Sequence, residues 1–88
     1  MNMMTQVMAR ELAQYHILVN AIAPGSIKTE FSRVDWMDPE RRAQRIQEIE
    51  LKRFGEPEEV VGAALLLASE AGSFMTGEII RVDGGKTI

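Results

Sequence analysis

The N-terminal segment has apolar residues at helical spacing, at Met4, Val7, Met8 and Leu12. This interval places them on one face of a helix. No Ser, Asp or Pro stands before the periodic run to cap it. We therefore expect residues 1–15 to form a helix that lacks the features of a helix start.

Two short apolar segments, residues 17–22 and 78–82, are predicted to be strands. The first, Ile17-Leu18-Val19-Asn20-Ala21-Ile22, ends at Ala23-Pro24-Gly25, which is a turn signal. Apolar side chains on both faces are typical of a strand inside a parallel sheet. The second strand is followed by Asp83-Gly84-Gly85.

A loop and two helices are predicted between these strands. Residues 26–37 show no clear period, which indicates a loop. Asp38-Pro39-Glu40 is a helix start, with Asp as the N-cap and Pro at the first helical position. Pro57 with the acids after it starts a second helix, residues 57–71. Gly62 inside it costs about 1 kcal/mol relative to Ala, so we expect a neighbouring element to approach closely there.

The order strand, helix, strand predicts one parallel crossover unit. Two parallel strands alone do not make a stable sheet. Residues 17–22 have the pattern of a central strand, yet the chain can pair them along one edge only. The other edge would be open and apolar, which favours aggregation or a partner strand. The pattern therefore predicts an α/β structure with a part missing.

Composition narrows the function classes. With 88 residues the chain is long enough for one small domain. A net charge of −3 gives no global attraction to nucleic acid or anionic lipid. The absence of cysteine excludes disulfides and thiolate metal sites. No apolar run is long enough to span a bilayer, and the start has no features of a secretory signal. We expect a cytoplasmic protein that binds neither nucleic acid nor membrane.

The sequence offers no complete catalytic or metal site of its own. No Gly-x-Gly occurs among the seven glycines, so the dinucleotide fingerprint is absent. Tyr15 is followed four residues later by Val19 rather than by Lys; we expect it to pack at a helix end. His16, the only histidine, has no oriented Ser and Asp suggested near it, and we expect a turn residue. One histidine and scattered carboxylates make no metal-ligand pattern.

Four sequence blocks together resemble a known family. They are Leu18 to Thr29 (LVNAIAPGSIKT), Arg53 to Val60 (RFGEPEEV), Ala68-Ser69, and Thr76-Gly77-Glu78 with Val82-Asp83-Gly84-Gly85. In this order and spacing they resemble the C-terminal part of a short-chain dehydrogenase/reductase. The segment from Ile27 to Arg33, followed by Trp36-Met37-Asp38, is similar to the carbonyl/retinal reductase branch.

The resemblance implies the last two strands, with their flanking helices, of a Rossmann-like doubly wound parallel sheet. It divides the chain into the end of the active-site helix (1–15), a strand (17–22), a cofactor and substrate loop with its lid (24–55), a helix (57–71) and the last strand (78–82). The family's Tyr-x-x-x-Lys motif would then lie just before Met1. The Gly-rich cofactor loop would lie further upstream, so the chain is expected to be a fragment that contains no catalytic residue.

The resemblance also assigns cofactor and substrate roles. In the family the cofactor is NAD or NADP, and the residues matching Pro24, Gly25, Ile27 and Thr29 line its nicotinamide. The alternative is that Pro24-Gly25 is only a turn and Thr29 only a helix cap. Phe31, Trp36 and Met37, with Ile46 and Ile49, would belong to a lid over an apolar carbonyl or alcohol substrate. Packing of the lid on the body of the protein explains them equally well.

Two functions remain open on the sequence alone. The first is the C-terminal portion of an NAD(P)-dependent oxidoreductase that is inactive by itself. The resemblance implies that its complete fold is a homo-oligomer, assembled through the last helix and the last strand. The second is a non-catalytic assembly module that docks on an intact relative through the same elements.

Overall fold

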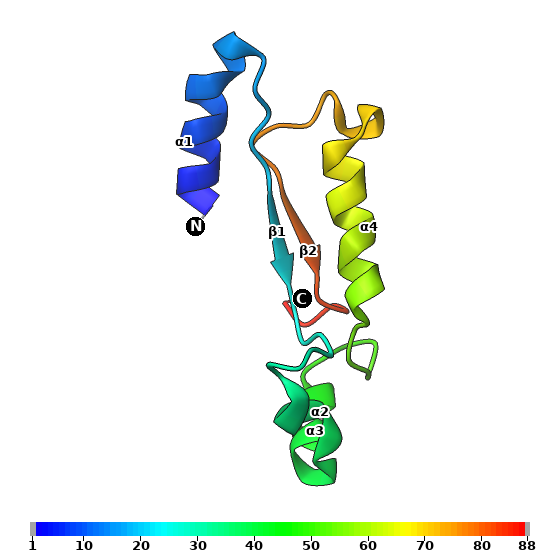
Figure 1. The fold of residues 1–88 in the computed structure, drawn as a ribbon. Coiled ribbons are helices and arrows are strands. Elements are labelled where there is room, and N and C mark those ends of the chain that lie inside the picture. Colours follow the sequence, from blue (N-terminus) through cyan, green and yellow to red (C-terminus); the bar gives the residue numbers. More distant parts are fainter. Residues whose placement is uncertain (1, 88) are drawn as a thin grey trace.

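The computed structural model describes residues 2–87 as two parallel strands with helices on both sides (Figure 1). The helices are α1 (Asn2–Leu12), α2 (Arg33–Met37), α3 (Pro39–Gln47) and α4 (Pro57–Ala68). Two 3₁₀ turns, η1 (Ala13–Tyr15) and η2 (Glu70–Gly72), follow α1 and α4. The strands are β1 (Ala21–Pro24) and β2 (Ile79–Val82). The fold is α/β, as the sequence predicts.

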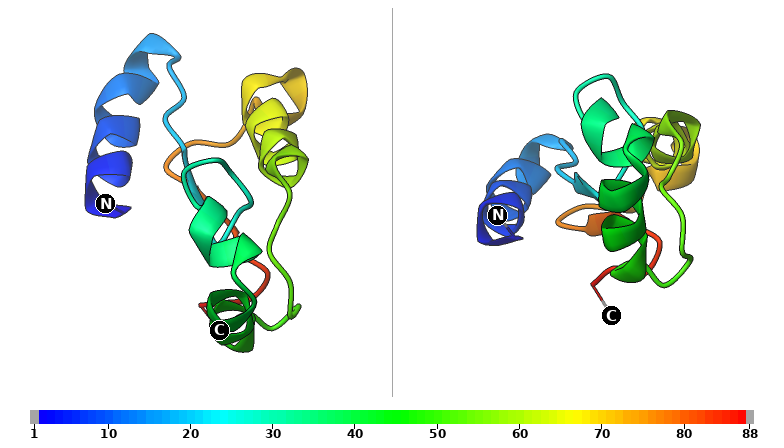
Figure 2. Two further views of the ribbon diagram at one scale, coloured as in Figure 1. Left: turned by 60° about the horizontal axis from the view of Figure 1, so that its bottom comes forward. Right: turned by 90° about the horizontal axis from the view of Figure 1, so that it is seen from below.

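The sheet lies between α1 and α4, and its carboxyl end faces the pair α2 and α3 (Figure 2). β1 and β2 pair in parallel, with Ala21 opposite Ile79 and Pro24 opposite Val82. The backbone N–H groups of Ala21 and Gly25 donate to Glu78 O and Val82 O, at 2.9 and 3.0 Å. The backbone N–H groups of every second residue, among them Ala21 and Gly25, therefore point toward β2. The N–H of Ile22 and the ring nitrogen of Pro24 point toward the open edge of the sheet. Proline is tolerated there because it removes no ladder bond.

The predicted strand bounds 17–22 are wrong, because the ladder begins only at Ala21. Just before the ladder, the Asn20 side chain holds the chain to residues 75–78. Asn20 Oδ1 accepts a hydrogen bond from Glu78 N at 3.0 Å, and Asn20 Nδ2 donates to Met75 O at 2.9 Å. At the other end the strand includes Pro24, which the sequence assigns to a turn.

Local capping explains the two longer helices after β1. Asp38 accepts a hydrogen bond from Arg41 N at 3.1 Å, and Pro39 occupies the first turn of α3, as predicted. At the start of α4, Glu59 accepts from Glu56 N at 2.9 Å, and Pro57 begins the helix. Both helix starts are confirmed.

Three further expectations from the sequence are wrong. Residues 26–37 are not all loop, because Arg33–Met37 form α2; five residues are little more than one turn, too short to show a period. A Cβ built on Gly62 would meet no atom of the described chain within 4 Å, so no close neighbour explains this glycine. Tyr15 is 64% exposed rather than packed at the helix end.

Little apolar surface is enclosed. Among residues 2–87 the buried hydrophobic side chains are Ala9, Ile49 and Phe54. The accessible surface is 6690 Å², whereas a folded monomer of this mass exposes about 5,200 Å². The Cα radius of gyration is 15.5 Å, compared with about 12 Å for a compact domain of this length. The described elements therefore leave apolar faces that they do not cover themselves.

None of the helices in residues 2–87 has both the length and the apolar character that crossing a membrane requires.

Candidate functional site

The candidate site begins where the two strands end together. Gly25 follows β1 and Asp83 follows β2, and the two backbones are in direct contact. A Cβ on Gly25 would lie 2.6 Å from Asp83 Cβ and 2.7 Å from Asp83 Cα. Only glycine therefore permits this approach. In open α/β sheets, ligands bind just beyond the carboxyl ends of the strands, which is where this contact lies.

The loop after Gly25 is fixed by a short parallel bridge between Ile27 and Gly55. Gly55 N donates to Ser26 O, and Lys28 N donates to Gly55 O, both at 2.9 Å. In a bridge of this pattern the N–H and C=O of Ile27 itself point away from Gly55. The Ile27 carbonyl accepts a hydrogen bond from Ser32 Oγ at 2.6 Å. The Ile27 N–H is thus directed away from the segment that holds the loop.

A cleft of about 640 Å³ opens beside this loop at the carboxyl ends of both strands. Its polar and charged lining comes from both strand ends, the lid and the C-terminal turn. The lining residues include Ala23, Pro24, Gly25, Ser26, Ile27, Thr29, Ser32, Asp35, Arg45, Phe54, Arg81, Asp83, Lys86 and Thr87. The structure therefore brings together all four residues that the resemblance assigns to the cofactor.

A second, apolar groove of about 360 Å³ is lined in part by the same loop. Pro24, Ile27 and Thr29 line it together with four residues of α4: Pro57, Val60, Val61 and Ala64. The loop from Pro24 to Thr29, which we call the ridge, thus lines both a cleft of mixed character and an apolar groove. Such a ridge can present backbone groups to one ligand part and apolar surface to another.

Thr29 closes a tight turn at the end of this ridge. Its hydroxyl accepts a hydrogen bond from Ser32 N at 3.2 Å and contacts Ser32 Oγ at 3.1 Å. The side chain remains exposed. Thr29 is thus not the cap of α2, whose N-cap residue is Ser32; its hydroxyl closes the turn before that helix, and Thr29 also lines the cleft.

The predicted lid residues are placed differently from one another. Phe31 is fully exposed and Met37 is 53% exposed. Trp36 is half-buried; its Nε1 donates to Thr29 O at 3.0 Å, and Lys28 Nζ lies 5.9 Å from the centre of its ring. Ile49, by contrast, is 2% exposed and packs under the turn at Gly84. Ile49 thus packs against the turn at Gly84, whereas the Phe31 side chain has no covering in the described chain.

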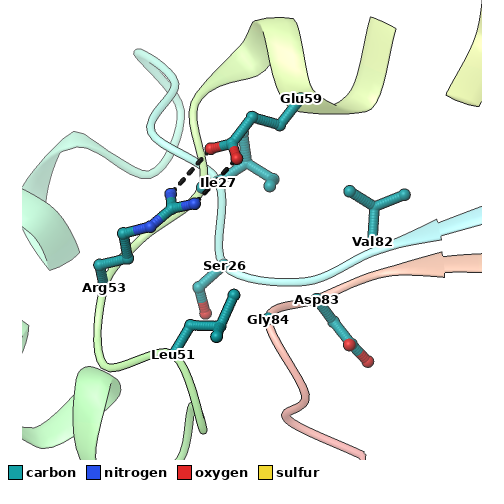
Figure 3. A pocket seen from close by; sticks show the side chains of 9 residues that line it. Ser26, Ile27, Leu51, Arg53, Glu59, Val82, Asp83 and Gly84 are labelled. Carbon is teal, nitrogen blue, oxygen red and sulfur yellow. Dashed lines mark hydrogen bonds and ion pairs between the residues drawn. The ribbon is translucent and has the colours of Figure 1, made fainter. Parts of the chain in front are cut away.

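An ion pair between Arg53 and Glu59, which the sequence pattern does not predict, lies at a cavity that Ser26 and Ile27 also line (Figure 3). Arg53 Nη1 and Nη2 donate to the two oxygens of the Glu59 carboxylate, at 2.8 and 2.9 Å. Both side chains line a small cavity of about 50 Å³, together with Ser26, Ile27, Leu51, Gly55, Val82, Asp83 and Gly84. The guanidinium hydrogen bonds, followed by the backbone N–H of Glu56, lower the pKa of Glu59 to about 2.

Asp83 is a second residue whose role the sequence analysis leaves unassigned. Its carboxylate accepts hydrogen bonds from Thr87 Oγ1 at 2.9 Å and from Gly85 N at 3.1 Å. The hydrogen bond from Thr87, with that from the Gly85 backbone, lowers the pKa of Asp83. An Asp-Gly-Gly sequence is a turn signal, and this turn forms one wall of the cleft.

We expect the Glu59 carboxyl to titrate near pH 2 in the folded chain, against an ordinary value of 4.5. Because the folded pKa is lowered, the stability that this group contributes is fully present above pH 4.5. It is lost as the pH falls toward 2. The check is an NMR pH titration of the Glu59 side-chain carboxyl carbon, in which Arg53→Gln should move the midpoint back toward 4.5.

Arg42→Gln on α3 is the matched control for this titration, because it removes an exposed arginine elsewhere. A midpoint above pH 4 in the unsubstituted chain would contradict the prediction.

Among residues 2–87, no group of three or more His, Cys, Asp or Glu side chains is arranged to hold a metal ion.

Comparison with known proteins agrees with this geometry. A family model described as enoyl-(acyl carrier protein) reductase matches residues 1–87. Dehydrogenase/reductase SDR family member 4 from Homo sapiens is 45% identical over 82 residues, covering 93% of this chain and 30% of the relative. The chain belongs to the short-chain dehydrogenase/reductase family.

Two further relatives extend the comparison. Glucose 1-dehydrogenase 2 from Bacillus subtilis is 49% identical over 86 residues, covering 98% of this chain and 33% of the relative. The structure of a Pseudomonas aeruginosa RhlG/NADP active-site complex matches with a TM-score of 0.92 and 37% identity, covering 99% of this chain and 34% of that one. The chain thus spans about a third of the length of these short-chain dehydrogenase/reductase relatives. The match to their Rossmann-type fold confirms the predicted fold class.

Proposed function

We propose that this chain forms the nicotinamide- and substrate-facing part of an NAD(P)-dependent oxidoreductase that acts on a carbonyl or alcohol. The observation that carries the proposal is the cleft at the strand ends, which Pro24, Gly25, Ile27 and Thr29 line together. Family membership supports the reaction class, and one similar structure is described as an NADP complex. The wall of this cleft offers backbone donors and close approach, which suit an amide-bearing ring.

Each residue of the ridge has a part in this proposal. The bare backbone at Gly25 lets a flat ring approach the strand ends. The N–H of Ile27, directed away from Gly55, donates to the carboxamide of the nicotinamide. The Thr29 hydroxyl reaches polar cofactor atoms while it holds the turn at Ser32. Pro24 packs against the ring. The cofactor, NAD or NADP, supplies the hydride when bound.

The lid contributes apolar contacts to the substrate in this proposal. The Phe31 and Met37 side chains are exposed, and their apolar character suits an apolar carbonyl compound. Trp36, bonded to the Thr29 carbonyl, couples the lid to the cofactor ridge.

The chain by itself is proposed to be inactive. Reduction of a carbonyl needs a proton donor within hydrogen-bond reach of the substrate oxygen. The sole tyrosine, Tyr15, has no lysine four residues later, and no Gly-x-Gly loop is present to hold a pyrophosphate. In this proposal the remaining two thirds of the family fold supply these groups.

A chimera tests the proposal directly. In it, this chain replaces the matching third of glucose 1-dehydrogenase 2 from Bacillus subtilis, to which it is 49% identical. We expect the chimera to bind NAD or NADP and to interconvert an apolar carbonyl compound and its alcohol with it. Saturating cofactor, at a hundred times its Kd, should raise its free energy of unfolding by about 2.7 kcal/mol. Enzyme kinetics and thermal unfolding with and without cofactor measure both effects.

The controls are the parent enzyme and the isolated chain, which should show no turnover. A folded chimera that neither turns over nor is stabilised by cofactor would contradict the proposal. An isolated chain that reduced a carbonyl compound with NADPH would contradict its inactivity alone.

A second candidate function is a non-catalytic module that docks on an intact relative. The observation that favours it is the exposed apolar surface of α4, where Val61 and Leu65 are 52% and 64% exposed. In this second function the chain would use the last helix and the last strand, the same elements through which the complete fold is expected to form a homo-oligomer. Two results together would distinguish this function. The isolated chain would co-purify with an intact relative, and replacing the matching third of the parent enzyme by this chain would leave the cofactor affinity unchanged.

A further inference from the structure

Several hydrogen bonds that share donor or acceptor atoms connect Arg53 to the first turn of α4. We call the two bonds between Arg53 and Glu59 the fork. Arg53 binds both oxygens of Glu59, at 2.8 and 2.9 Å. One of those oxygens, Oε1, also accepts from Glu56 N at 2.9 Å. Arg53 Nη1 in turn donates to Phe54 O at 3.1 Å. Four groups of the segment 53–59 are therefore fixed relative to one another.

This segment is also what holds the cofactor ridge. Gly55 exchanges two backbone hydrogen bonds with Ser26 and Lys28. Glu56 adds an ion pair with Lys28 Nζ at 3.2 Å. The Ile27 side chain fits against the bare backbone of Gly55, where a Cβ would lie 2.7 Å from Ile27 Cδ1. A displacement of Gly55 must therefore move Ile27.

We propose that Arg53 and Glu59 are positioning residues, which set the Ile27 N–H for the nicotinamide by fixing Gly55. The proposal rests on the function proposed above. Neither residue is among those that line the larger cleft; both line the small cavity that Ile27 also lines (Figure 3). They act on the cofactor only through the bridge between Gly55 and Ile27.

A purely stabilising role does not account for this arrangement. The two side chains are 50% and 41% exposed, so solvent screens their charges, and the pair owes its strength to the aligned geometry of the fork. A bidentate fork instead fixes orientation, because both oxygens and both nitrogens must align. Lysine at position 53 would keep the charge and lose the fork. The proposal therefore predicts a defect in cofactor binding that charge alone does not repair.

The test uses three variants of the chimera: Arg53→Gln, Arg53→Lys and, as matched control, Arg42→Gln on α3. Misplacing a binding group by even 1 Å is costly, so we expect Arg53→Gln to raise the KM for the cofactor about tenfold. Its kcat at saturating cofactor and its Tm should change little. Arg53→Lys should show most of the same rise in KM, and Arg42→Gln should match the unsubstituted chimera.

A second measurement, in the 88-residue chain itself, keeps the result independent of the proposed function. The amides of Lys28 and Gly55 donate the two bridge hydrogen bonds. In Arg53→Gln their hydrogen exchange should be about tenfold faster, as the bridge opens locally. In Arg42→Gln the exchange should stay unchanged.

The outcomes separate the two proposals. An inactive chimera together with faster exchange in Arg53→Gln would sink the proposed function and leave the positioning of Ile27 by Arg53 standing. Unchanged exchange, or a KM for Arg53→Gln equal to that for Arg42→Gln, would overturn the positioning role. A parallel loss of Tm and kcat with an unchanged KM would also overturn it, because the pair would then be merely structural.

Discussion

Replacing Gly25 by Ala is expected to lower the free energy of unfolding of the chimera by about 1–3 kcal/mol. The added methyl group would lie 2.6 Å from Asp83 Cβ and 2.7 Å from Asp83 Cα. One of these atoms is backbone, so no side-chain rotation relieves the contact. The ends of β1 and β2 must separate, and the Gly25–Val82 hydrogen bond of 3.0 Å must lengthen.

We expect Gly25→Ala to raise the Kd for the cofactor as well as to lower the free energy of unfolding. The displaced backbone carries Ile27 with it, and the cleft wall at the strand ends changes shape. Urea unfolding and the Kd for NADP, measured on the same protein, test both effects. We expect the cofactor to give Gly25→Ala less stabilisation than it gives the unsubstituted chimera.

Gly62→Ala is the matched control, since it makes the same substitution on α4. No described atom lies within 4 Å of the new methyl group. Alanine is the better helix former, so in the 88-residue chain, where no further element covers α4, this variant should gain about 1 kcal/mol, and Gly25→Ala is compared with it there. Equal losses in the two variants would show that crowding at Asp83 is not the cause, and would contradict the prediction for Gly25.

The parts of the fold that the sequence predicts well are those with local signals. Asp38-Pro39 and Pro57-Glu58-Glu59 carry their caps within one turn of the helix they start, so the pattern places both starts correctly. The bounds of β1 depend instead on its partner. The Asn20 side chain is hydrogen-bonded to residues more than fifty positions away. No local pattern indicates that backbone pairing begins at the next residue, Ala21.

The candidate site likewise has residues that one local sequence block predicts and residues that only the tertiary structure brings to it. Pro24, Gly25, Ile27 and Thr29 can be named because they lie within six consecutive residues of a recognisable block, and they do share one cleft. Asp83 reaches the same cleft from the other strand end, at a sequence distance of 58 positions from Gly25. The Arg53–Glu59 fork spans a helix start and is hidden within a motif that predicts only the helix. The contact between strand ends depends on tertiary structure, and the fork on side-chain geometry that the spacing alone does not specify.

Gly62 illustrates a different limit. Its helix cost indicates a close neighbour, yet the described chain provides none. The exposed apolar side chains of α4 and the excess surface of the molecule show the same incomplete covering. The local sequence pattern thus predicts the two strands and the longer helices correctly in type, but it misses the short helix α2. The apolar faces of these elements are left partly uncovered by residues 2–87.

Ile49→Ala is expected to cost the chimera about 2–5 kcal/mol, because deleting a fully buried aliphatic side chain leaves a cavity. Ile49 is 2% exposed, and its Cγ2 lies 2.8 Å from where a Cβ on Gly84 would stand. The backbone of the same turn is held by the Leu51 N to Gly84 O hydrogen bond of 3.0 Å. The segment before Leu51 is therefore held to the turn after β2 by the Ile49 side chain together with this hydrogen bond.

The loss should appear in urea unfolding, and it should also loosen the lid. Leu51→Ala is the control, because that side chain is 63% exposed, and we expect a change of about 0.5 kcal/mol or less. If Ile49→Ala unfolds at the same urea concentration as Leu51→Ala, the lid does not depend on this contact. Ile49 would then have to be reassigned from lid-to-body packing to the substrate face, which was the other interpretation of the sequence.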